Sequence, residues 1–250
     1  MATYKKTGSK SRKKAKEAQS TTAEVFSTLD KSASKTEQWV ARNQKYIFGV
    51  IGVIVLGVLG YLGYMELIQK PKETEASNEL FFAQQYFDQA DGSAEKDSLY
   101  NLALTGAEGK YGLLDIIEKY SGTKAANLAR YTAGMAYLNL NKYEEAIAYL
   151  QEFSASDIML GALAKGGLGD AFAQLNQSED ALTYYEEAFD YHVNDYLTPR
   201  FLFKAGTMAM DLEQYDKALT YFKRIKDEFP NSEEGRTIDV YIGNVEYLLK

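Results

Sequence analysis

Three glycines in the second half of this chain are each followed by an alanine twelve residues later. The pairs are Gly134 with Ala146, Gly169 with Ala181, and Gly206 with Ala218. Apolar residues stand four and seven positions after each alanine, which is the spacing of one helix face. Glycine costs a helix about 1 kcal/mol relative to alanine, so its return predicts a tight crossing at which the glycine of one helix meets the alanine of the next. The pattern predicts three helical hairpins.

These hairpins belong to a longer helical array. We expect the three units at about 127–158, 162–193 and 199–230, with a divergent first pair at 77–120 that Gly106, Gly109 and Gly112 interrupt. Repeat stacks need a terminal helix that shields the last apolar face, and residues 235–250 fit that role. Residues 73–250 therefore read as one domain.

The repeats resemble the tetratricopeptide repeat (TPR). Its small residue, aromatic, alanine and second large residue correspond to Gly134, Tyr137, Ala146 and Leu150, and to Gly169, Phe172, Ala181 and Tyr185. The third unit has Gly206, Ala218, Phe222 and the closing Pro230, but Ala209 replaces the aromatic. The resemblance implies an all-α, TPR-like helical-hairpin solenoid with an open right-handed curl.

Residues 46–65 contain no charged side chain. A helix needs about 20 predominantly apolar residues to cross a bilayer core, so this segment predicts one transmembrane helix in contact with lipid. Trp39, Tyr46, Tyr61 and Tyr64 stand at its edges, where aromatic rings suit the headgroup region. Forty-five residues precede the segment and it lacks a small-residue cleavage site, so we interpret it as an anchor and not as a signal peptide.

The chain has two electrostatically different parts. Residues 1–45 hold 11 basic and 4 acidic side chains, whereas the rest holds 17 and 31. The cationic excess before the span predicts a cytoplasmic N-terminus and an exported domain. The first 20 residues predict a disordered basic tail, because they carry almost no large apolar side chain. Thr21 and Ser34 each begin a capping box, which predicts two short helix starts before the membrane.

Little in the sequence predicts catalysis. There is no cysteine, and the single histidine, His192, lies in a polar turn, so neither a metal cluster nor a nucleophile with its base stands out. We expect no enzyme, cofactor, catalytic residue or metal ion. The basic run from Lys5 to Glu17 has Tyr4 as its nearby aromatic, so it favours a lipid-facing tail over nucleic-acid binding.

The TPR resemblance also implies a protein-binding surface. Proteins of this family hold peptides on the concave face formed by their first helices. The matching positions here are Leu128, Tyr131, Met135, Asp170, Phe203, Thr207 and Met210. The lysine and asparagine clamp that grips a C-terminal carboxylate in some TPR proteins is missing, which disfavours such a ligand. Aromatic and methionine side chains favour adaptable binding of extended chains, although several could instead belong to the core between repeats.

The layout of the whole chain resembles the YfgM-like group of bacterial proteins, ancillary subunits of the Sec translocon. That resemblance implies a single-pass protein of the inner membrane with a periplasmic TPR domain. It also implies contact with the translocon through the span and transfer of exported clients to periplasmic chaperones. Two alternatives stay open: a chaperone-like or envelope-assembly adaptor independent of the translocon, and a mitochondrial import receptor with cytosolic repeats.

Overall fold

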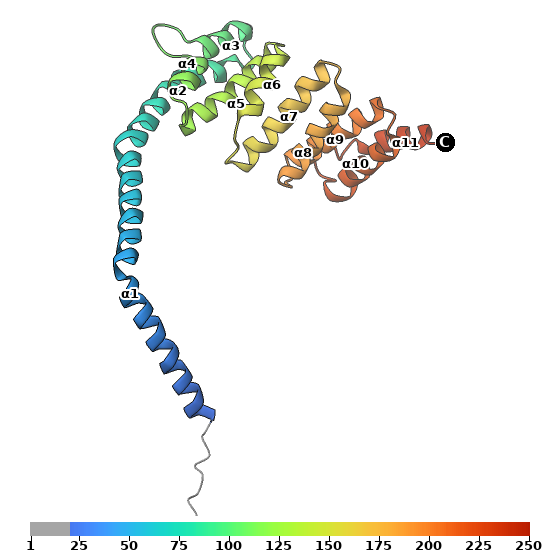
Figure 1. Cartoon of the computed structure of the whole chain (residues 1–250). Helices are drawn as coiled ribbons and strands as arrows, with labels where there is room; N and C mark the ends of the chain where they lie inside the picture. The colour runs from blue at the N-terminus through green and yellow to red at the C-terminus, as the bar shows by residue number, and fades with distance from the viewer. Residues whose placement is uncertain (1–20) are drawn as a thin grey trace, which may run out of the picture. The chain divides into compact units, whose positions relative to one another are not determined.

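The computed structural model describes residues 21–250, and Figure 1 shows them as a succession of helices. The predicted basic tail, residues 1 to about 20, lies outside the described part of the chain. Every regular element from residue 21 onward is helical, which confirms the all-α class. The chain divides into two compact units, Met1–Gly63 and Tyr64–Lys250.

The first unit is formed by one long helix, α1 (Thr21–Tyr64). Its first residue, Thr21, is also the first residue that the structure describes, so the helix start at the first predicted capping box stays a prediction. The second predicted start, at Ser34, is wrong because α1 runs through it without interruption. No glycine or proline occurs between residues 21 and 48, so nothing in the sequence ends the first helix before a second could begin. A capping box marks a helix start only where the preceding chain is not already helical.

The uncharged segment forms part of this helix. Within the described residues, one helical stretch, Thr36–Ala90, is long and apolar enough to cross a membrane, with a window of mean hydropathy 2.2. Most large side chains of the apolar segment are exposed, Ile54 among them, whereas Ile47 and Met65 at its ends are half-buried. The helix buries none of this window against the rest of the protein, as expected of a surface whose solvent is lipid.

The second unit contains all the remaining helices. They are a π-helical turn η1 (Met65–Gln69), α2 (Lys70–Ala90), α3 (Lys96–Thr105), α4 (Leu113–Lys119), α5 (Lys124–Asn139), α6 (Tyr143–Glu152), α7 (Ile158–Gln174), α8 (Ser178–Tyr191), α9 (Leu197–Asp211), α10 (Tyr215–Glu228) and α11 (Ile238–Leu248).

Consecutive helices from α5 to α10 form three hairpins with the same turn. Asn141, Asn176 and Glu213 occupy the left-handed region, each with φ close to +58°. The following N–H returns to a carbonyl in the last turn of the first helix, at 2.9 Å for Lys142 and Gln177 and 2.8 Å for Gln214. This is the hydrogen-bond pattern of a Schellman motif, which satisfies the free carbonyls of a helix end. The repeated turn fixes the angle at which each second helix returns.

The glycines bring the two helices of each hairpin together. A Cβ at Gly134, Gly169 or Gly206 would overlap the side chain of Leu150, Tyr185 or Phe222, respectively. Each of these large residues stands four positions after the alanine, and 16 after the glycine. The nearest neighbour of each glycine is therefore a large side chain of the second helix, one helical turn beyond the alanine that the sequence pattern indicated.

Helix α7 carries further glycines at the places where aromatic rings of α8 and α9 pack against its backbone. A Cβ at Gly161 would overlap the ring of Tyr191, and one at Gly166 would overlap the ring of Phe201. Most of the buried core falls into two clusters, one running from α2 to α5 and one from α7 to α11. A small cluster of Leu150, Ala164 and Leu168 lies between them. The stack is thus packed pair against pair, as in a solenoid.

At the N-terminal end of the stack, a carboxylate of α2 binds the start of α5. Helix α2 packs against α3 and α5, and its Glu73 accepts hydrogen bonds from the backbone N–H groups of Lys124 (2.7 Å) and Ala125 (3.0 Å). These are first-turn donors of α5, which have no partner within the helix. A carboxylate there also suits the positive end of the helix dipole. Glu73 therefore caps a helix some 50 residues further along the chain.

Removal of this cap should weaken the domain. We expect Glu73→Ala to lower the free energy of unfolding by about 1 kcal/mol and to accelerate amide hydrogen exchange at Lys124 and Ala125. Gln85→Ala, an exposed change on the same helix, is the matched control. Equal exchange rates in the two variants would contradict the capping role.

Candidate protein-binding surface

The first helices of the three hairpins, α5, α7 and α9, are neighbours in the stack, since α7 contacts both others. We call the face defined by the predicted positions on these helices the inner surface. All seven predicted residues are half-buried: Leu128, Tyr131, Met135, Asp170, Phe203, Thr207 and Met210. Part of the surface of each side chain is therefore exposed to solvent, and the other part packs against the protein itself. Whether the seven bind a partner stays a prediction.

The α5 residues fill the junction between the first two hairpins. The ring of Tyr131 lies 5.3 Å from that of Phe153, centroid to centroid. Tyr131 and Met135 both pack against the Leu150 cluster, while Leu128 packs against the N-terminal core. Burial raises the pKa of the Tyr131 hydroxyl. These side chains therefore contribute to the contact between repeats.

Asp170 on α7 is engaged by two neighbours. The Tyr185 hydroxyl donates a hydrogen bond to its Oδ1 at 2.7 Å, and the Lys204 ammonium on α9 forms an ion pair with the same oxygen. The carboxylate thus links the second hairpin to the third. A ligand that used Asp170 would have to compete with a charge-assisted bond already in place.

The α9 residues cover the C-terminal end of the inner surface. The ring of Phe203 lies 4.7 Å from that of Tyr241 on α11 and 6.0 Å from that of Phe222, and Met210 packs against the same core. Thr207 differs from these, because its hydroxyl bonds only to the backbone oxygen of Lys204 in its own helix, at 2.8 Å. The described hydrogen bond of Thr207 therefore stays within its own helix and does not tie the side chain to a neighbouring one.

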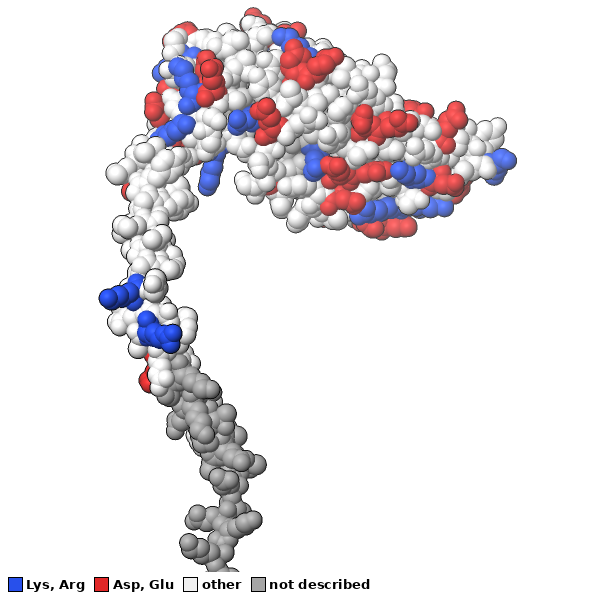
Figure 2. All heavy atoms as spheres, in the orientation of Figure 1, with Lys and Arg blue, Asp and Glu red and all other residues white. Residues whose placement is uncertain are grey.

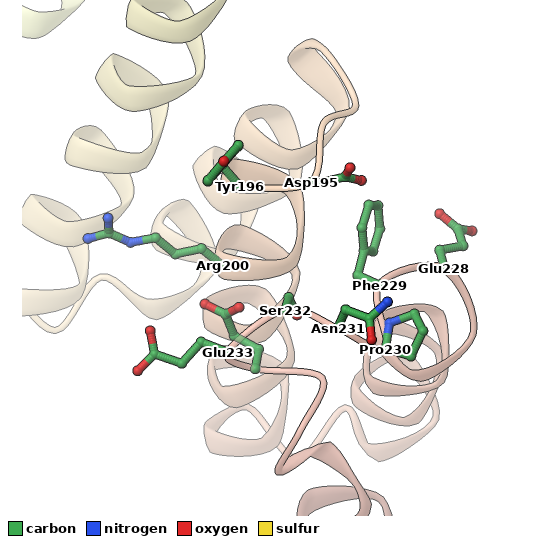
Figure 3. A pocket seen from close by; sticks show the side chains of 10 residues that line it. Asp195, Tyr196, Arg200, Glu228, Phe229, Pro230, Asn231, Ser232 and Glu233 are labelled. Atoms are coloured by element: carbon green, nitrogen blue, oxygen red, sulfur yellow. The ribbon is translucent and has the colours of Figure 1, made fainter.

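A cleft of about 680 Å³, at which we predicted no site, opens where the start of α9 meets the end of α10. Figure 3 shows its lining, in which Asp195, Tyr196 and Arg200 come from the start of α9 and the remainder from the end of α10 and the following turn: Glu228, Phe229, Pro230, Asn231, Ser232, Glu233 and Glu234. Tyr196 is 81% exposed. The carboxylates outnumber the one cation, so the cleft favours a cationic segment over an anionic one.

A second cleft, of about 440 Å³, lies between α6, α7 and α8. Its wall includes Leu150, Phe153 and Tyr191, with the Lys165 and Glu187 pair at its rim. Neither cleft could be predicted from the sequence, because the walls of each depend on how successive hairpins stack. For the first cleft, one local signal was the EFPNSEEGR segment, residues 228–236, at the end of the third hairpin.

Charge does not single out a binding face. On the visible side of the repeat unit, Lys and Arg lie beside Asp and Glu, as Figure 2 shows. Many of them are paired between helices, such as Arg130 with Glu152 at 3.2 Å and Lys217 with Glu186 at 3.0 Å. Exposed pairs of this kind contribute about 0 to 1 kcal/mol each. They help to set the register of neighbouring helices and give little attraction for a strongly charged partner.

Several tyrosines of the repeat stack have a raised pKa, which makes the stability of the folded state fall at high pH. Burial and a hydrogen bond to Glu75 raise the pKa of Tyr120 to about 12. Burial and the nearby Asp170 also raise the pKa of Tyr185, and burial with Glu186 raises that of Tyr221. A raised folded-state pKa gives stability that is complete below the unfolded value of about 10 and is lost as pH rises from there towards the folded value.

We therefore expect the thermal unfolding midpoint to fall as pH rises from about 9 to about 11. Tyr120→Phe should make this fall shallower, because one phenol no longer ionises on unfolding. Tyr196→Phe, at an exposed position, should leave it unchanged. Identical slopes in all three proteins would contradict the role of Tyr120.

The described residues hold no group of three or more His, Cys, Asp or Glu side chains placed to bind a metal ion. His192 is exposed at the end of α8, where its backbone oxygen accepts a hydrogen bond from the Asn194 side chain at 2.9 Å. Its imidazole is not part of any described cluster. The candidate protein-binding surface is therefore characterised here by its shape and packing.

Comparison with known proteins identifies the repeats. A family profile described as tetratricopeptide repeat matches residues 131–188 and, overlapping, 167–233. No curated protein matches the chain. The two matches cover the hairpins that share the glycine, turn and large-residue pattern. The chain therefore contains tetratricopeptide repeats, a non-catalytic domain type that acts as a scaffold by binding proteins or peptides.

Proposed function

We propose that this chain is a membrane-anchored adaptor that assists protein export at the Sec translocon of a bacterial inner membrane. In this proposal the TPR domain lies in the periplasm and passes exported clients to periplasmic chaperones. The main observation that supports this proposal is that a TPR scaffold and a helix able to cross a membrane occur in the same chain. The cationic excess before the span supports the orientation.

The inner surface would hold clients weakly. Most of its side chains are half-buried and already pack within the protein, so a client gains only the exposed remainder of each. Area that is already buried cannot contribute to binding. Low affinity suits an adaptor that must release its clients. The competing proposal, an envelope-assembly adaptor that works without the translocon, has the same surface and differs in the partner of the span.

In-cell photocrosslinking would separate the two proposals. A photoreactive residue at Ile54 reports on the span, one at Thr207 reports on the inner surface, and one at exposed Thr220 on α10 serves as the control. Translocon subunits at Ile54, with exported chains or chaperones at Thr207, are the expected result. Lipid or self-crosslinks at Ile54, with envelope proteins at Thr207, would favour the competing proposal. Identical products at Thr207 and Thr220 would contradict binding by the inner surface.

The proposed orientation can be tested separately. The chain has no cysteine, so Thr220→Cys provides a single labelling site in the TPR domain. We expect a membrane-impermeant maleimide to label it in spheroplasts with an intact inner membrane. Labelling that required disruption of the membrane would place the repeats in the cytoplasm and exclude the periplasmic role.

A further inference from the structure

The part of α1 that leads into the uncharged segment repeats a pattern every seven residues. The first position of the pattern is occupied by Phe26, Ala33, Val40 and Ile47. The second position, three residues later each time, is occupied by Leu29, Thr36, Asn43 and Val50. We call these eight residues the heptad stripe. Because α1 is one continuous helix, alternate spacings of three and four place all eight positions on one side of it.

Charged residues are segregated from the heptad stripe. The basic residues of α1 are Lys31, Lys35, Arg42 and Lys45. All four stand two or five positions after a first-position residue, which is the side of the helix opposite the stripe. The two acidic residues nearest to the stripe, Asp30 and Glu37, stand at one edge of it. The helix therefore has one uncharged side and one cationic side before it reaches the apolar segment.

The large apolar side chains of the stripe are mostly exposed. Phe26, Leu29 and Val50 are 64%, 58% and 60% exposed, and Val40 is 43% exposed. Helices in proteins gain most of their stability by packing such an apolar face against a neighbour. Phe26, Leu29 and Val40 precede the apolar segment, so lipid tails are not the solvent that would cover them. The stripe is therefore a surface suited to a helical partner.

The shape of α1 also fits such a partner. A hollow of about 340 Å³ lies on the stripe and is lined in part by Asn43, Tyr46, Ile47 and Val50. These four residues follow one another at spacings of three, one and three. In a coiled coil each stripe side chain inserts into a hole formed by four residues of the facing helix. An adjoining hollow of about 810 Å³ includes Val40 and Ile47, so the stripe carries both the projecting side chains and the holes.

We propose that the heptad stripe pairs with the heptad stripe of a second copy of this chain, in a parallel two-stranded coiled coil over residues 26–50. Two copies that insert into the membrane in the same orientation run parallel, so Val40 faces its equivalent. β-Branched residues at the first position, here Val40 and Ile47, with leucine at the second, here Leu29, favour two strands.

Asn43 provides a polar contact in this pairing. Its amide nitrogen donates a hydrogen bond to the Trp39 backbone oxygen at 2.8 Å. An amide side chain has a second N–H and an oxygen as well, and in the parallel pair these face the Asn43 amide of the other copy. A single polar residue within an apolar seam fixes the register of the two helices.

A second copy fits the stripe better than a lipid surface does. A helix that lies on a bilayer must turn where it enters the bilayer, whereas α1 continues without a break to Tyr64. In the self-pair the four basic residues of each copy stand away from the interface, so they do not oppose it.

The pairing goes beyond the proposed export role and does not depend on it. From Ile51 to Met65 no side chain is charged, so the sequence marks no face there and the heptad stripe ends at Val50. Ile54 stays available to a membrane partner, and the experiments below do not use it. Their failure would leave the proposed function untouched.

Single cysteines test which side of α1 faces the second copy. The chain has no cysteine, so Val40→Cys introduces one thiol in the stripe and Gln38→Cys introduces one on the opposite side, at an exposed position. Copper phenanthroline oxidises two neighbouring thiols to a disulfide. In isolated membranes that hold the full-length chain, we expect the linked dimer to form at least about tenfold faster for Val40→Cys, because proximity sets the rate. Equal rates at the two positions would overturn the proposal.

Charge substitutions test the register. Val40→Lys places two ammonium groups face to face and should weaken dimerisation of the solubilised full-length chain at least about tenfold, as measured by sedimentation equilibrium. Gln38→Lys, on the opposite side, should leave it unchanged. A mixture of Val40→Lys and Val40→Glu chains should recover the dimer, because residue 40 faces residue 40.

Three results would contradict the pairing. A monomeric unaltered chain would overturn it outright. Failure of the mixed chains to pair would exclude the parallel register. A Val40→Cys product that contains a different protein in place of a second copy would assign the heptad stripe to that protein.

Discussion

Phe222→Ala is expected to lower the free energy of unfolding of the TPR domain by about 3 to 5 kcal/mol, the cost of removing a fully buried phenyl ring from a packed core. Phe222 is 0% exposed, lies over Gly206, and has the ring of Tyr241 5.6 Å away. It therefore joins both helices of the third hairpin to α11. Chemical denaturation of the full-length chain in detergent, followed by circular dichroism, measures the change.

Two further variants test the reason for this loss. Phe81→Ala removes the same side chain from an exposed position on α2 and should change stability by less than about 0.5 kcal/mol. Gly206→Leu should destabilise the normal protein through overlap with Phe222. In the Phe222→Ala background the same leucine should cost less, because it enters the vacated space. Additive losses in the double variant would contradict direct packing between the two positions.

The sequence predicted the hairpin register because that register depends on local pattern. Gly134, Gly169 and Gly206 recur with large residues at helical spacing, and small residues inside a helix require a packing reason. The nearest neighbour of each glycine is the large residue one helical turn beyond the predicted alanine. The residues 12 and 16 positions after the glycine lie on the same face of the second helix. The local pattern does not show which of them comes nearest, because that depends on the angle set by the turn at Asn141, Asn176 or Glu213.

The inner surface was harder to predict, because its residues have two roles that look alike in a sequence. Tyr131 and Phe203 fit a peptide-binding groove as well as a core, and the structure shows both packing against rings of neighbouring helices. Asp170 was predicted to face a ligand, and Tyr185 and Lys204 bind its carboxylate. These contacts join residues 15 and 34 positions apart. They depend on the stacking of hairpins and on no local motif.

Helix α11 shows where the regular spacing stops being informative. A capping helix was expected from the need to close the stack, and α11 buries Ile238 and Val245. Gly243 follows Gly206 by the same 37 residues that separate Gly206 from Gly169, but a Cβ at Gly243 would meet nothing within 4 Å. The spacing alone therefore could not distinguish a glycine that receives a large side chain from one that does not.

Two arginines in the apolar segment should remove the protein from the membrane. Each arginine near the centre of a spanning helix costs about 2.5 to 3.5 kcal/mol, so Val53→Arg with Leu56→Arg should offset much of the insertion energy of a span of this length. Both side chains are exposed, at 72% each, and neither belongs to the core of the TPR domain, which should therefore stay folded. Carbonate extraction of isolated membranes is expected to retain the normal chain and release the variant.

The same substitutions outside the span provide the control. Gln38→Arg with Ala41→Arg adds two charges at exposed positions of α1 that precede the apolar segment, and because cations near a helix end reach the headgroups, this variant should remain in the membrane fraction. Release of both variants would mean that any added charge detaches the protein, as expected of peripheral attachment. Retention of both would place the anchor elsewhere. Release of the Val53 and Leu56 variant alone, with an unchanged thermal unfolding midpoint, would separate the anchor from the scaffold and assign insertion to the uncharged segment of α1.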